Sequence, residues 1–556
     1  MSDKVKLGKH PRALYVLFFT EMWERFAYYL MVGILLLYMI DSKTGGKGFD
    51  QKVGADIVGS FIALVYLTPF IGGLIADRYL GYVKSIFLGG SLMAAGYLGL
   101  SIPGNTAMFI SLTLVIVGNG FFKPNISTLL GNIYNREDLK PLKDNAYNIF
   151  YMGINIGAFV CNFVAAYLRN KYGWGWAFSA AGVGLIIGLV NLAMNLPAVK
   201  TGDLKKPVQK EDMSLSQILG YVFLPAMIAA LIGWLLPVKI FGSPLMGTQA
   251  NDAFIFACIP IIAFYVSLWV KAKGSDKKAI GSLLFIFVVA VAFWTIYNQN
   301  ATGLTLWAEK HTDRVASPTA AAITGKLFPM QEVSDKPRLV NKVDANFVEV
   351  KDAAGKTVQA MGPDPYFNNV PKNEWPGGKN VKLTNTELFQ SINPLFIVVL
   401  TLIFVPFFDY LRRRGKEPTT ASKFGMAMFI SGLSALVMVF AVMSVPSIYT
   451  HKTSPLWLWG TYFVFTISEI FLSPIGLSFV SKLSPPRLTA LMMGGWFLAT
   501  SIGGKIAGVM TGFWDEFTDK KVFFMLMVVA AFIGGIFIYS KLKSLNQIVR
   551  ERTGEE

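Results

Sequence analysis

Long apolar segments recur along nearly the whole chain, separated by polar connections. Each segment is long enough to cross the roughly 30 Å hydrocarbon layer of a membrane. Backbone groups in that layer must bond within their own segment, so we expect helices. The predicted spans are residues 13–40, 53–76, 84–102, 106–130, 146–169, 176–196, 215–238, 252–270, 280–307, 388–411, 421–445, 456–483, 489–513 and 522–542. This pattern predicts an all-α integral membrane protein with about 14 transmembrane helices.

The predicted spans fall into groups of six, two and six. This grouping predicts an N-terminal six-helix bundle in residues 1–196, a linker with two inserted helices in 197–279, and a C-terminal six-helix bundle in 280–556. Paired halves around a central site are a common design of secondary transporters. Within the last part, residues 309–387 form a long polar loop, which we expect to be a cap or a spacer. Alternating residues at 347–350, followed by Gly355, predict a small β-hairpin there.

Composition and charge support a membrane protein and assign its orientation. Of 556 residues, 53% are hydrophobic and 15% charged, whereas soluble domains carry about 25% charged residues. The net charge of +17 does not indicate nucleic-acid binding, because basic residues concentrate in alternate connections. Arg412, Arg413 and Arg414 follow one span, whereas residues 101–107 on the opposite side carry no basic residue. The asymmetry predicts a multi-pass protein of the plasma membrane (a bacterial inner membrane) with both termini cytoplasmic.

Cysteine and histidine give no sign of a cofactor. Cys161 and Cys258 lie inside apolar segments, where cysteine is usually a small buried hydrophobe. The three histidines lie at or beyond segment ends. We therefore expect no disulfide, no metal site and no cofactor.

Five of the charged residues inside predicted spans indicate a candidate site, because a charge at the membrane centre costs about 2.5–3.5 kcal/mol on insertion scales. Glu21, Glu24 and Arg25 share one face of the first helix, because they are three or four residues apart. A static salt bridge that fixes helix packing is one explanation; a functional site is the other. Lys123 in the fourth span and Glu469 in the second half favour function, because cations in one half then face an anion in the other. A dipolar ligand with a carboxylate and an ammonium group would be held at both ends.

Uncharged residues near these charges extend the predicted site. Asn155 and Asn393 each offer a donor and an acceptor, which suits a peptide backbone, although a lone asparagine in a membrane helix often only joins two helices. Tyr28, Tyr66 and Trp496 could line side-chain pockets or simply pack. A separate motif ends the second span and indicates a conformational gate. Its glycines would permit close helix approach and its charges a latch, and its key residues are Gly72, Gly73, Asp77 and Arg78.

Several of these motifs resemble the proton-dependent oligopeptide transporter family within the major facilitator superfamily. The first-helix signature is Glu21-x-x-Glu24-Arg25-Phe26, and the fifth-helix signature is Phe150-Tyr151-x-x-Ile154-Asn155-x-Gly157. Further matches are Lys123-Pro124-Asn125, Asn393-Pro394, Glu469 through Ser473-Pro474, and the superfamily loop motif at 72–81. The resemblance extends from the first helix to the eleventh of the twelve-helix core.

The resemblance implies alternating access, with proton influx driving the uptake of di- and tripeptides. By the same resemblance, Arg25 and Lys123 would receive the peptide carboxylate, and Glu21 and Glu24 would take part in proton coupling with Arg25. The residues implied in substrate binding are Arg25, Tyr28, Tyr66, Lys123, Asn155, Asn393, Glu469, Ser473 and Trp496. Protons are the implied coupling ion, and the implied partners are the peptide and the lipid bilayer.

One feature departs from the family pattern. Bacterial members commonly carry a second arginine seven residues after the signature arginine, paired with a glutamate in the seventh helix. Here these positions hold Val32 and Asn298, so both partners are absent together and no buried charge is left unpaired. The usual seventh-helix proton site is therefore in doubt, and we expect Glu21, Glu24 and Glu469 to carry coupling.

Three alternatives stay open on the sequence. A related cargo, such as nitrate, another anion or a peptide-like drug, is the first, although Glu469 favours a ligand with an ammonium group. A transport-inactive peptide sensor is the second, because of Val32 and Asn298. A membrane-embedded enzyme is the third; it is disfavoured because no HExxH, GxSxG or phosphate-cradling motif occurs. Peptide length, proton stoichiometry and oligomeric state do not follow from the sequence.

Overall fold

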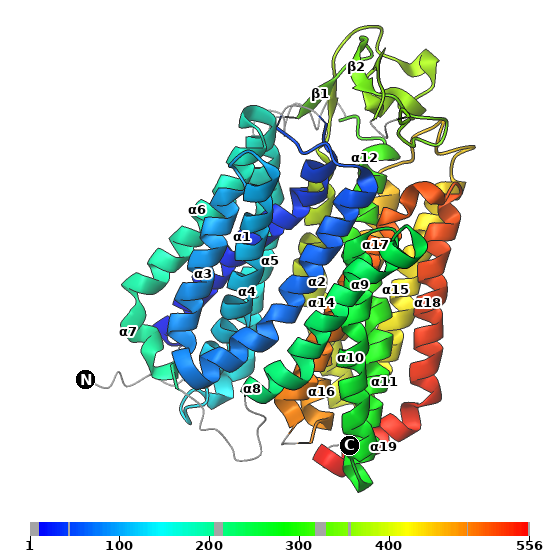
Figure 1. The fold of residues 1–556 in the computed structure, drawn as a ribbon. Helices are drawn as coiled ribbons and strands as arrows, with labels where there is room; N and C mark the ends of the chain where they lie inside the picture. The colour runs from blue at the N-terminus through cyan, green and yellow to red at the C-terminus, as the bar shows by residue number, and fades with distance from the viewer. Residues whose placement is uncertain are drawn as a thin grey trace.

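The computed structural model describes residues 10–42, 45–204, 215–316, 330–353, 357–485 and 488–553, and its long helices follow the predicted order of six, two and six (Figure 1). The first six are α1 (Arg12–Ile40), α2 (Gln51–Ile75), α3 (Tyr82–Gly99), α4 (Asn105–Ile133), α5 (Lys143–Tyr172) and α6 (Trp174–Met194). The inserted pair is α9 (Leu224–Phe241), which continues the short α8 (Leu215–Ile218), and α10 (Gln249–Lys271). The last six are α11 (Gly274–Tyr297), α14 (Ile392–Arg413), α15 (Thr420–Met443), α16 (Leu456–Leu483), α17 (Thr489–Gly512) and α18 (Lys520–Ser540). Shorter helices are α7 (Leu196–Val199), α12 (Gly303–Lys310) and α19 (Leu542–Thr553).

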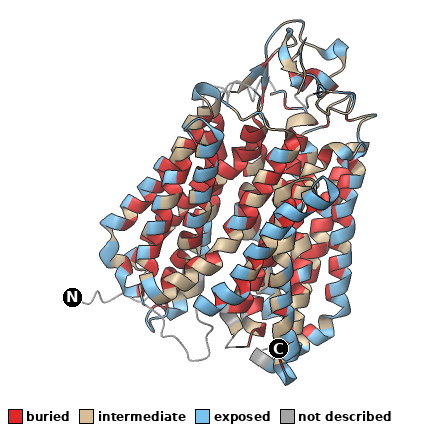
Figure 2. Ribbon diagram, in the orientation of Figure 1, coloured by how far each residue is buried: buried red, intermediate tan, exposed pale blue. Residues whose placement is uncertain are grey.

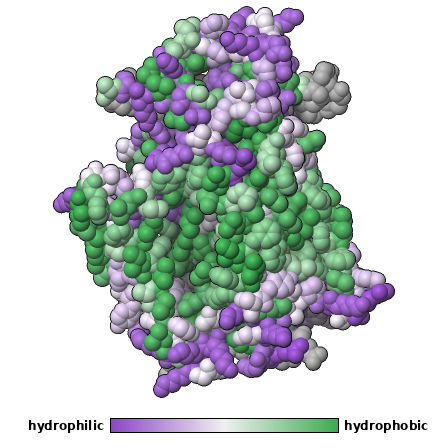
Figure 3. Space-filling view, turned by 90° about the vertical axis from the view of Figure 1, so that its right-hand side faces the viewer, coloured by the Kyte–Doolittle hydropathy of each residue, from purple (hydrophilic) through white to green (hydrophobic). Residues whose placement is uncertain are grey.

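An apolar belt covers the outside of the helices. On the face shown in Figure 3, hydrophobic side chains gather over the middle, with hydrophilic ones above and below. Large apolar side chains such as Leu402 and Val288 are 74% and 72% exposed, whereas the sides of the helices that face one another are buried (Figure 2). Within the described part of the chain, eleven helices are long and apolar enough to cross a membrane. An exposed belt of this kind faces lipid, and the chain is a helical multi-pass membrane protein.

The two chain ends lie on one side of the helices and the β-strands on the other (Figure 1). We call these the terminus side and the loop side. Within the first half, α1 packs on α5 and α6, and α3 packs on α4 and α6. Within the second half, α15 packs on α16 and α18, and α11 packs on α17. The halves meet mainly through two helix pairs, α2 with α17 and α5 with α14.

The span predicted at 280–307 is present as one apolar segment, Gly274–Lys310, but its helix is interrupted near the loop-side end. Helix α11 ends at Tyr297, residues 298–301 form a 3₁₀ turn, and α12 begins at Gly303. Gln299 Oε1 accepts hydrogen bonds from the Gly303 amide at 3.2 Å and from Thr302 Oγ1 at 3.3 Å. Asn298 Nδ2 donates to Trp294 O at 2.7 Å and Thr302 Oγ1 to Asn298 O at 3.1 Å. Short polar side chains that bond to nearby backbone compete with the regular helix, and hydropathy alone does not register that competition.

The loop between α12 and α14 carries two small antiparallel sheets. Strand β1 (Gln331–Val333) pairs with β4 (Val381–Leu383), and β2 (Arg338–Asn341) pairs with β3 (Gln359–Gly362). The hairpin predicted from residues 347–350 is present as a narrow extension of the second sheet, because the Val358 amide bonds to Val350 O at 2.8 Å and Lys351 pairs with Thr357. Gly355, its predicted turn residue, lies outside the described residues.

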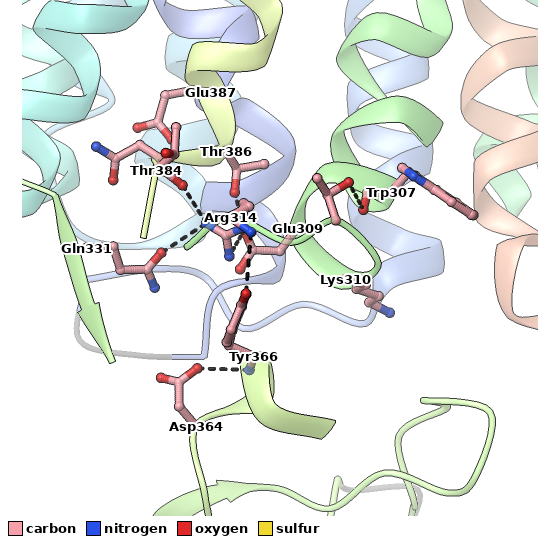
Figure 4. Close-up of polar contacts among 12 residues, drawn as sticks. Trp307, Glu309, Lys310, Arg314, Gln331, Asp364, Tyr366, Thr384, Thr386 and Glu387 are labelled. Carbon is pink, nitrogen blue, oxygen red and sulfur yellow. Dashed lines mark hydrogen bonds and ion pairs between the residues drawn. The ribbon is translucent and has the colours of Figure 1, made fainter. Parts of the chain in front are cut away.

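A buried arginine fixes this loop to the membrane helices (Figure 4). The Arg314 side chain is 1% exposed, and its guanidinium contacts Glu309 Oε2 at 3.1 Å, Thr384 O at 3.1 Å and Gln331 Oε1 at 3.3 Å. The Arg314 amide lies 3.4 Å from the Tyr366 hydroxyl. These contacts tie both ends of the loop to the end of α12, so the described part of the loop is a folded cap.

Candidate functional site

A cavity of about 310 Å³ lies between the two halves, at the lower end of the volume range of small-molecule sites. Helices α1, α2, α4 and α5 of the first half line it, together with α11, α14, α16 and α17 of the second. The structure brings nine predicted residues to its wall: Glu21, Arg25, Tyr28, Tyr66, Lys123, Asn155, Asn393, Glu469 and Trp496. These residues come from segments far apart in the sequence.

The first half supplies two cationic groups, Arg25 and Lys123, beside the carboxylates of Glu21 and Glu24. Arg25 Nε lies 3.2 Å from Glu21 Oε1 and bonds to Glu24 Oε2, and Arg25 and both glutamates are nearly fully buried. Arg25 Nη2 is buried and has no hydrogen-bond partner among the described residues, so it keeps a donor for a ligand. Lys123 Nζ lies 4.0 Å from the centre of the Tyr66 ring, and Arg25 lies 5.3 Å from the Tyr28 ring. Aromatic faces stabilise cations without neutralising them.

The second half supplies an anionic pole. Glu469 Oε2 accepts a hydrogen bond from Asn393 Nδ2 at 2.8 Å, and the same Nδ2 lies 3.0 Å from Thr466 Oγ1. Glu469 is 6% exposed and forms no ion pair with any other residue that the structure describes. A buried carboxylate with a single amide donor retains acceptor capacity for a cationic ligand group.

The other predicted site residues take different places. Glu24 is fully buried against Arg25 and does not line the cavity. Asn155 lines the cavity, but its Nδ2 donates to Tyr151 O at 2.9 Å in its own helix. Trp496 packs edge to face on Trp294 with ring centroids 6.3 Å apart. The side chain of Ser473 lies outside the described residues.

The structure adds cavity residues to which the sequence analysis assigned no role in the site: Tyr151, Asn162, Tyr297, Asn300 and Gln390. Gln390 joins the halves, because its Nε2 donates to Gly33 O at 3.0 Å and to Thr305 Oγ1 at 2.9 Å. A glutamine three residues before Asn393 in an apolar segment is the signal that could have identified it.

Val32 and Asn298 both line the cavity. The Asn298 side-chain amide donates to Trp294 O at 2.7 Å, and Val32 is 8% exposed. No charge lies at either position, so this place carries no ion pair between the halves. Among the described residues, no group of three histidine, cysteine or acidic side chains is arranged to hold a metal.

The glycine motif at the terminus-side end of α2 permits the close helix contact that the sequence predicted. A Cβ on Gly72 would lie 2.0 Å from Gly120 O of α4, whereas one on Gly73 would meet only Pro124 Cβ at 3.6 Å. Asp77 Oδ1 accepts a hydrogen bond from the Tyr82 hydroxyl at 2.6 Å, so the motif also binds α3. Its role in gating, and that of Arg78, stays a prediction.

These two glycines give a matched pair of variants. We expect Gly72→Ala to destabilise the protein by about 1–3 kcal/mol, because the α2 and α4 backbones must move apart, and Gly73→Ala to be nearly neutral. Melting temperatures in detergent measure the difference. Equal melting temperatures for the two variants would contradict the packing described here.

A sequence model of the POT family matches residues 83–319 and 380–530. The chain belongs to the POT family. It is 30% identical over 536 residues to the uncharacterized transporter YclF of Bacillus subtilis, covering 95% of this chain and 93% of that one. It is 28% identical to a di-/tripeptide transporter of Lactococcus lactis subsp. cremoris, covering 97% of each chain.

Solved structures agree with the POT assignment. The crystal structure of a peptide transporter POT in complex with sulfate superposes with a TM-score of 0.73 at 28% identity, covering 98% of this chain and 96% of that one. A mutant peptide transporter POT in complex with alafosfalin gives a TM-score of 0.72, also at 28% identity. The POT fold is that of the major facilitator superfamily, as predicted, and the protein is a transporter and not an enzyme.

Proposed function

We propose that this POT protein imports di- and tripeptides together with protons by alternating access. One observation carries the proposal: a single cavity between the halves has Arg25 and Lys123 on one side and Glu469 on the other. A zwitterionic peptide carries one charge of each sign at its two ends, so it can satisfy both poles at once. The Lactococcus relative is named a di-/tripeptide transporter, which supports the same cargo class.

Each pole has a proposed role. Arg25 and Lys123 receive the peptide carboxylate, and Glu469, with Asn393 and Asn155, holds the amino end. Tyr28, Tyr66 and Trp496 shape the space for the peptide side chains, and we propose Ser473 as a further contact. Charge-assisted hydrogen bonds of this kind are roughly twice as strong as neutral ones, so the two termini fix the orientation of the cargo.

Proton coupling rests on competition for Arg25. In this structure Arg25 binds Glu21 and Glu24. A proton that binds to either glutamate removes its negative charge and weakens its ion pair with Arg25. Arg25 can then bind the carboxylate of the incoming peptide. Proton and peptide therefore favour each other's binding. Each proton that enters gains about 2.3 kcal/mol per 100 mV of membrane potential, in addition to the pH gradient.

We also propose the orientation predicted from charge, with the terminus side cytoplasmic and the loop side outside. Arg412 and Arg413 end α14 on the terminus side, which supports it. Exposed Lys379 of the loop and Lys416 after α14 provide the test. In spheroplasts of a cysteine-free background, Lys379→Cys should react with an impermeant maleimide, and Lys416→Cys only after permeabilisation. The reverse pattern would invert the topology.

The central test is uptake of labelled dialanine into liposomes, with and without an inward proton gradient and a negative interior potential. Accumulation driven by the gradient establishes a proton-coupled peptide importer. Peptide exchange without such accumulation would show an uncoupled carrier. No movement of dialanine would contradict the proposed cargo and direct attention to nitrate, other anions or peptide-like drugs.

Glu21→Gln and Glu24→Gln test the coupling proposal. Glutamine keeps the shape and a hydrogen-bond acceptor but cannot exchange a proton. We expect gradient-driven accumulation to fall at least about tenfold, while dialanine counterflow continues. If both single variants and the double variant kept full pH-driven uptake, coupling would have to lie elsewhere.

A transport-inactive peptide sensor is the second candidate. The uncharged pair Val32 and Asn298 favours it, because the position that commonly couples the halves in bacterial members holds no charge here. Binding of dialanine without counterflow would identify a sensor.

A further inference from the structure

The two helix pairs that join the halves are equivalent in position. Helix α2 is the second of the first half and packs on α17, the fifth of the second half. Helix α5 is the fifth of the first half and packs on α14, the second of the second half. Exchanging the first half with the second would therefore turn one interface into the other. Each of them carries one buried ion pair.

The first pair joins Asp56 of α2 to Lys505 of α17. Lys505 Nζ bonds to Asp56 Oδ1, with side chains 2% and 9% exposed, and lies 2.6 Å from Ser60 Oγ. Thr248, at the start of α10, donates to Asp56 Oδ2 at 2.6 Å, so the inserted pair joins the same cluster. The backbones are in contact beside it, because a Cβ on Gly59 would lie 2.8 Å from Gly508 Cα.

The second pair joins Arg169, near the end of α5, to Glu387, just before α14. Arg169 Nη2 lies 3.2 Å from Glu387 Oε2, with side chains 13% and 0% exposed. Two neutral contacts flank it across the same interface. Asn170 Nδ2 donates to Asn385 Oδ1 at 2.7 Å, and Asn162 Nδ2 lies 3.0 Å from Ser391 Oγ.

Both pairs lie on the loop side of the cavity. Asp56 is in the second turn of α2, just after the connection from α1, and Lys505 is near the loop-side end of α17. Glu387 directly follows the loop, next to Thr386, which bonds to Glu309 at the loop's base (Figure 4). The cavity between the halves can open to the loop side only if these ends separate.

We propose that Asp56–Lys505 and Arg169–Glu387 together form the loop-side gate of the transport cycle, in the place of a charged pair at Val32 and Asn298. The proposal rests on the proposed function, because a gate is needed only if the halves alternate. When the gate is closed, each charge is buried and needs its partner. When it opens, water hydrates all four charges, so the pairs can part.

Removing one partner should therefore favour the open gate. Asp56→Asn destabilises the closed state, because Lys505 is then buried without a counter-charge, whereas in the open state water hydrates it. Glu387→Gln destabilises the closed state in the same way, through Arg169. Removing both partners, as in Asp56→Asn/Lys505→Met, leaves no charge to bury. The population of the closed state should then return, because replacing a buried ion pair with uncharged groups often leaves stability unchanged or increases it.

The test is labelling of a cysteine at Ala301, which lines the cavity, in the background Cys161→Ala/Cys258→Ala. Spheroplasts receive an impermeant maleimide from the loop side. We expect labelling to be slow in this background, at least about tenfold faster with Asp56→Asn or Glu387→Gln, and slow again in the Asp56→Asn/Lys505→Met double variant.

Controls distinguish opening of the gate from a general loss of stability and from an effect on cargo transport. Asp138→Asn breaks an exposed pair with Arg136 on the terminus side and should not change labelling, and melting temperatures report any general loosening. Unchanged labelling in both single variants, or fast labelling that persists in the double variant, would overturn the gate. Dialanine uptake measured in the same variants judges the proposed function separately, since labelling does not depend on the cargo.

Discussion

Glu469→Gln is expected to abolish gradient-driven accumulation of dialanine. The variant keeps the shape of the side chain and its contact with Asn393 Nδ2, but it removes the anion that faces the peptide ammonium group. A hydrogen bond to a charged group contributes about 1.5–3 kcal/mol, so affinity should fall by about tenfold or more. Initial rates of uptake over a range of dialanine concentrations measure the loss.

A modified cargo makes this prediction specific. N-acetyl-dialanine has no ammonium group, so the unmodified protein should bind it at least about tenfold more weakly than dialanine. Glu469→Gln should lose most of this discrimination. Asp138→Asn, which alters an exposed carboxylate paired with Arg136 on the terminus side, serves as the control and should transport normally. Full discrimination retained by Glu469→Gln would place the amino end of the peptide elsewhere.

Arg25→Met should have the largest effect on stability. Without Arg25, Glu21 and Glu24 remain buried on one helix with no partner beside them. Breaking a buried pair by removing one partner costs about 3–5 kcal/mol. We expect a lower melting temperature in detergent and a loss of dialanine binding, because the carboxylate loses its principal cation.

A triple variant separates these two effects. Arg25→Met/Glu21→Gln/Glu24→Gln removes all three charges, so most of the lost stability should return while peptide binding stays weak. Recovery of binding along with stability would show that Arg25 only holds the helices together, which is the static salt bridge considered from the sequence.

Features encoded in single segments could be predicted from the sequence. Lys123 and Glu469 are conspicuous because each is a lone charge within an apolar run, and the structure places both at one cavity. The helix order followed from hydrophobic segment length. The roles proposed for the residues at this cavity rest on family motifs as well as on the positions of the charges.

Features that depend on distant partners could not be predicted. Asp56 and Lys505 are 449 residues apart, and each by itself looks like a charge near a membrane surface. The break after Tyr297 depends on side chains of residues 298–302 that bond to nearby backbone, an arrangement that hydropathy does not register. The contacts of Gln390 could not be predicted either, because its partners Gly33 and Thr305 lie in other helices.

The folded cap has a practical consequence for imaging. A membrane protein embedded in a detergent micelle offers few features by which single particles can be aligned. Here the paired strands β1 and β4, with Arg314 at the base, hold a structured mass outside the apolar belt. Strands β2 and β3 form a second small sheet in the same loop. An epitope placed on these paired strands would give an antibody fragment a firm attachment point without touching the helices.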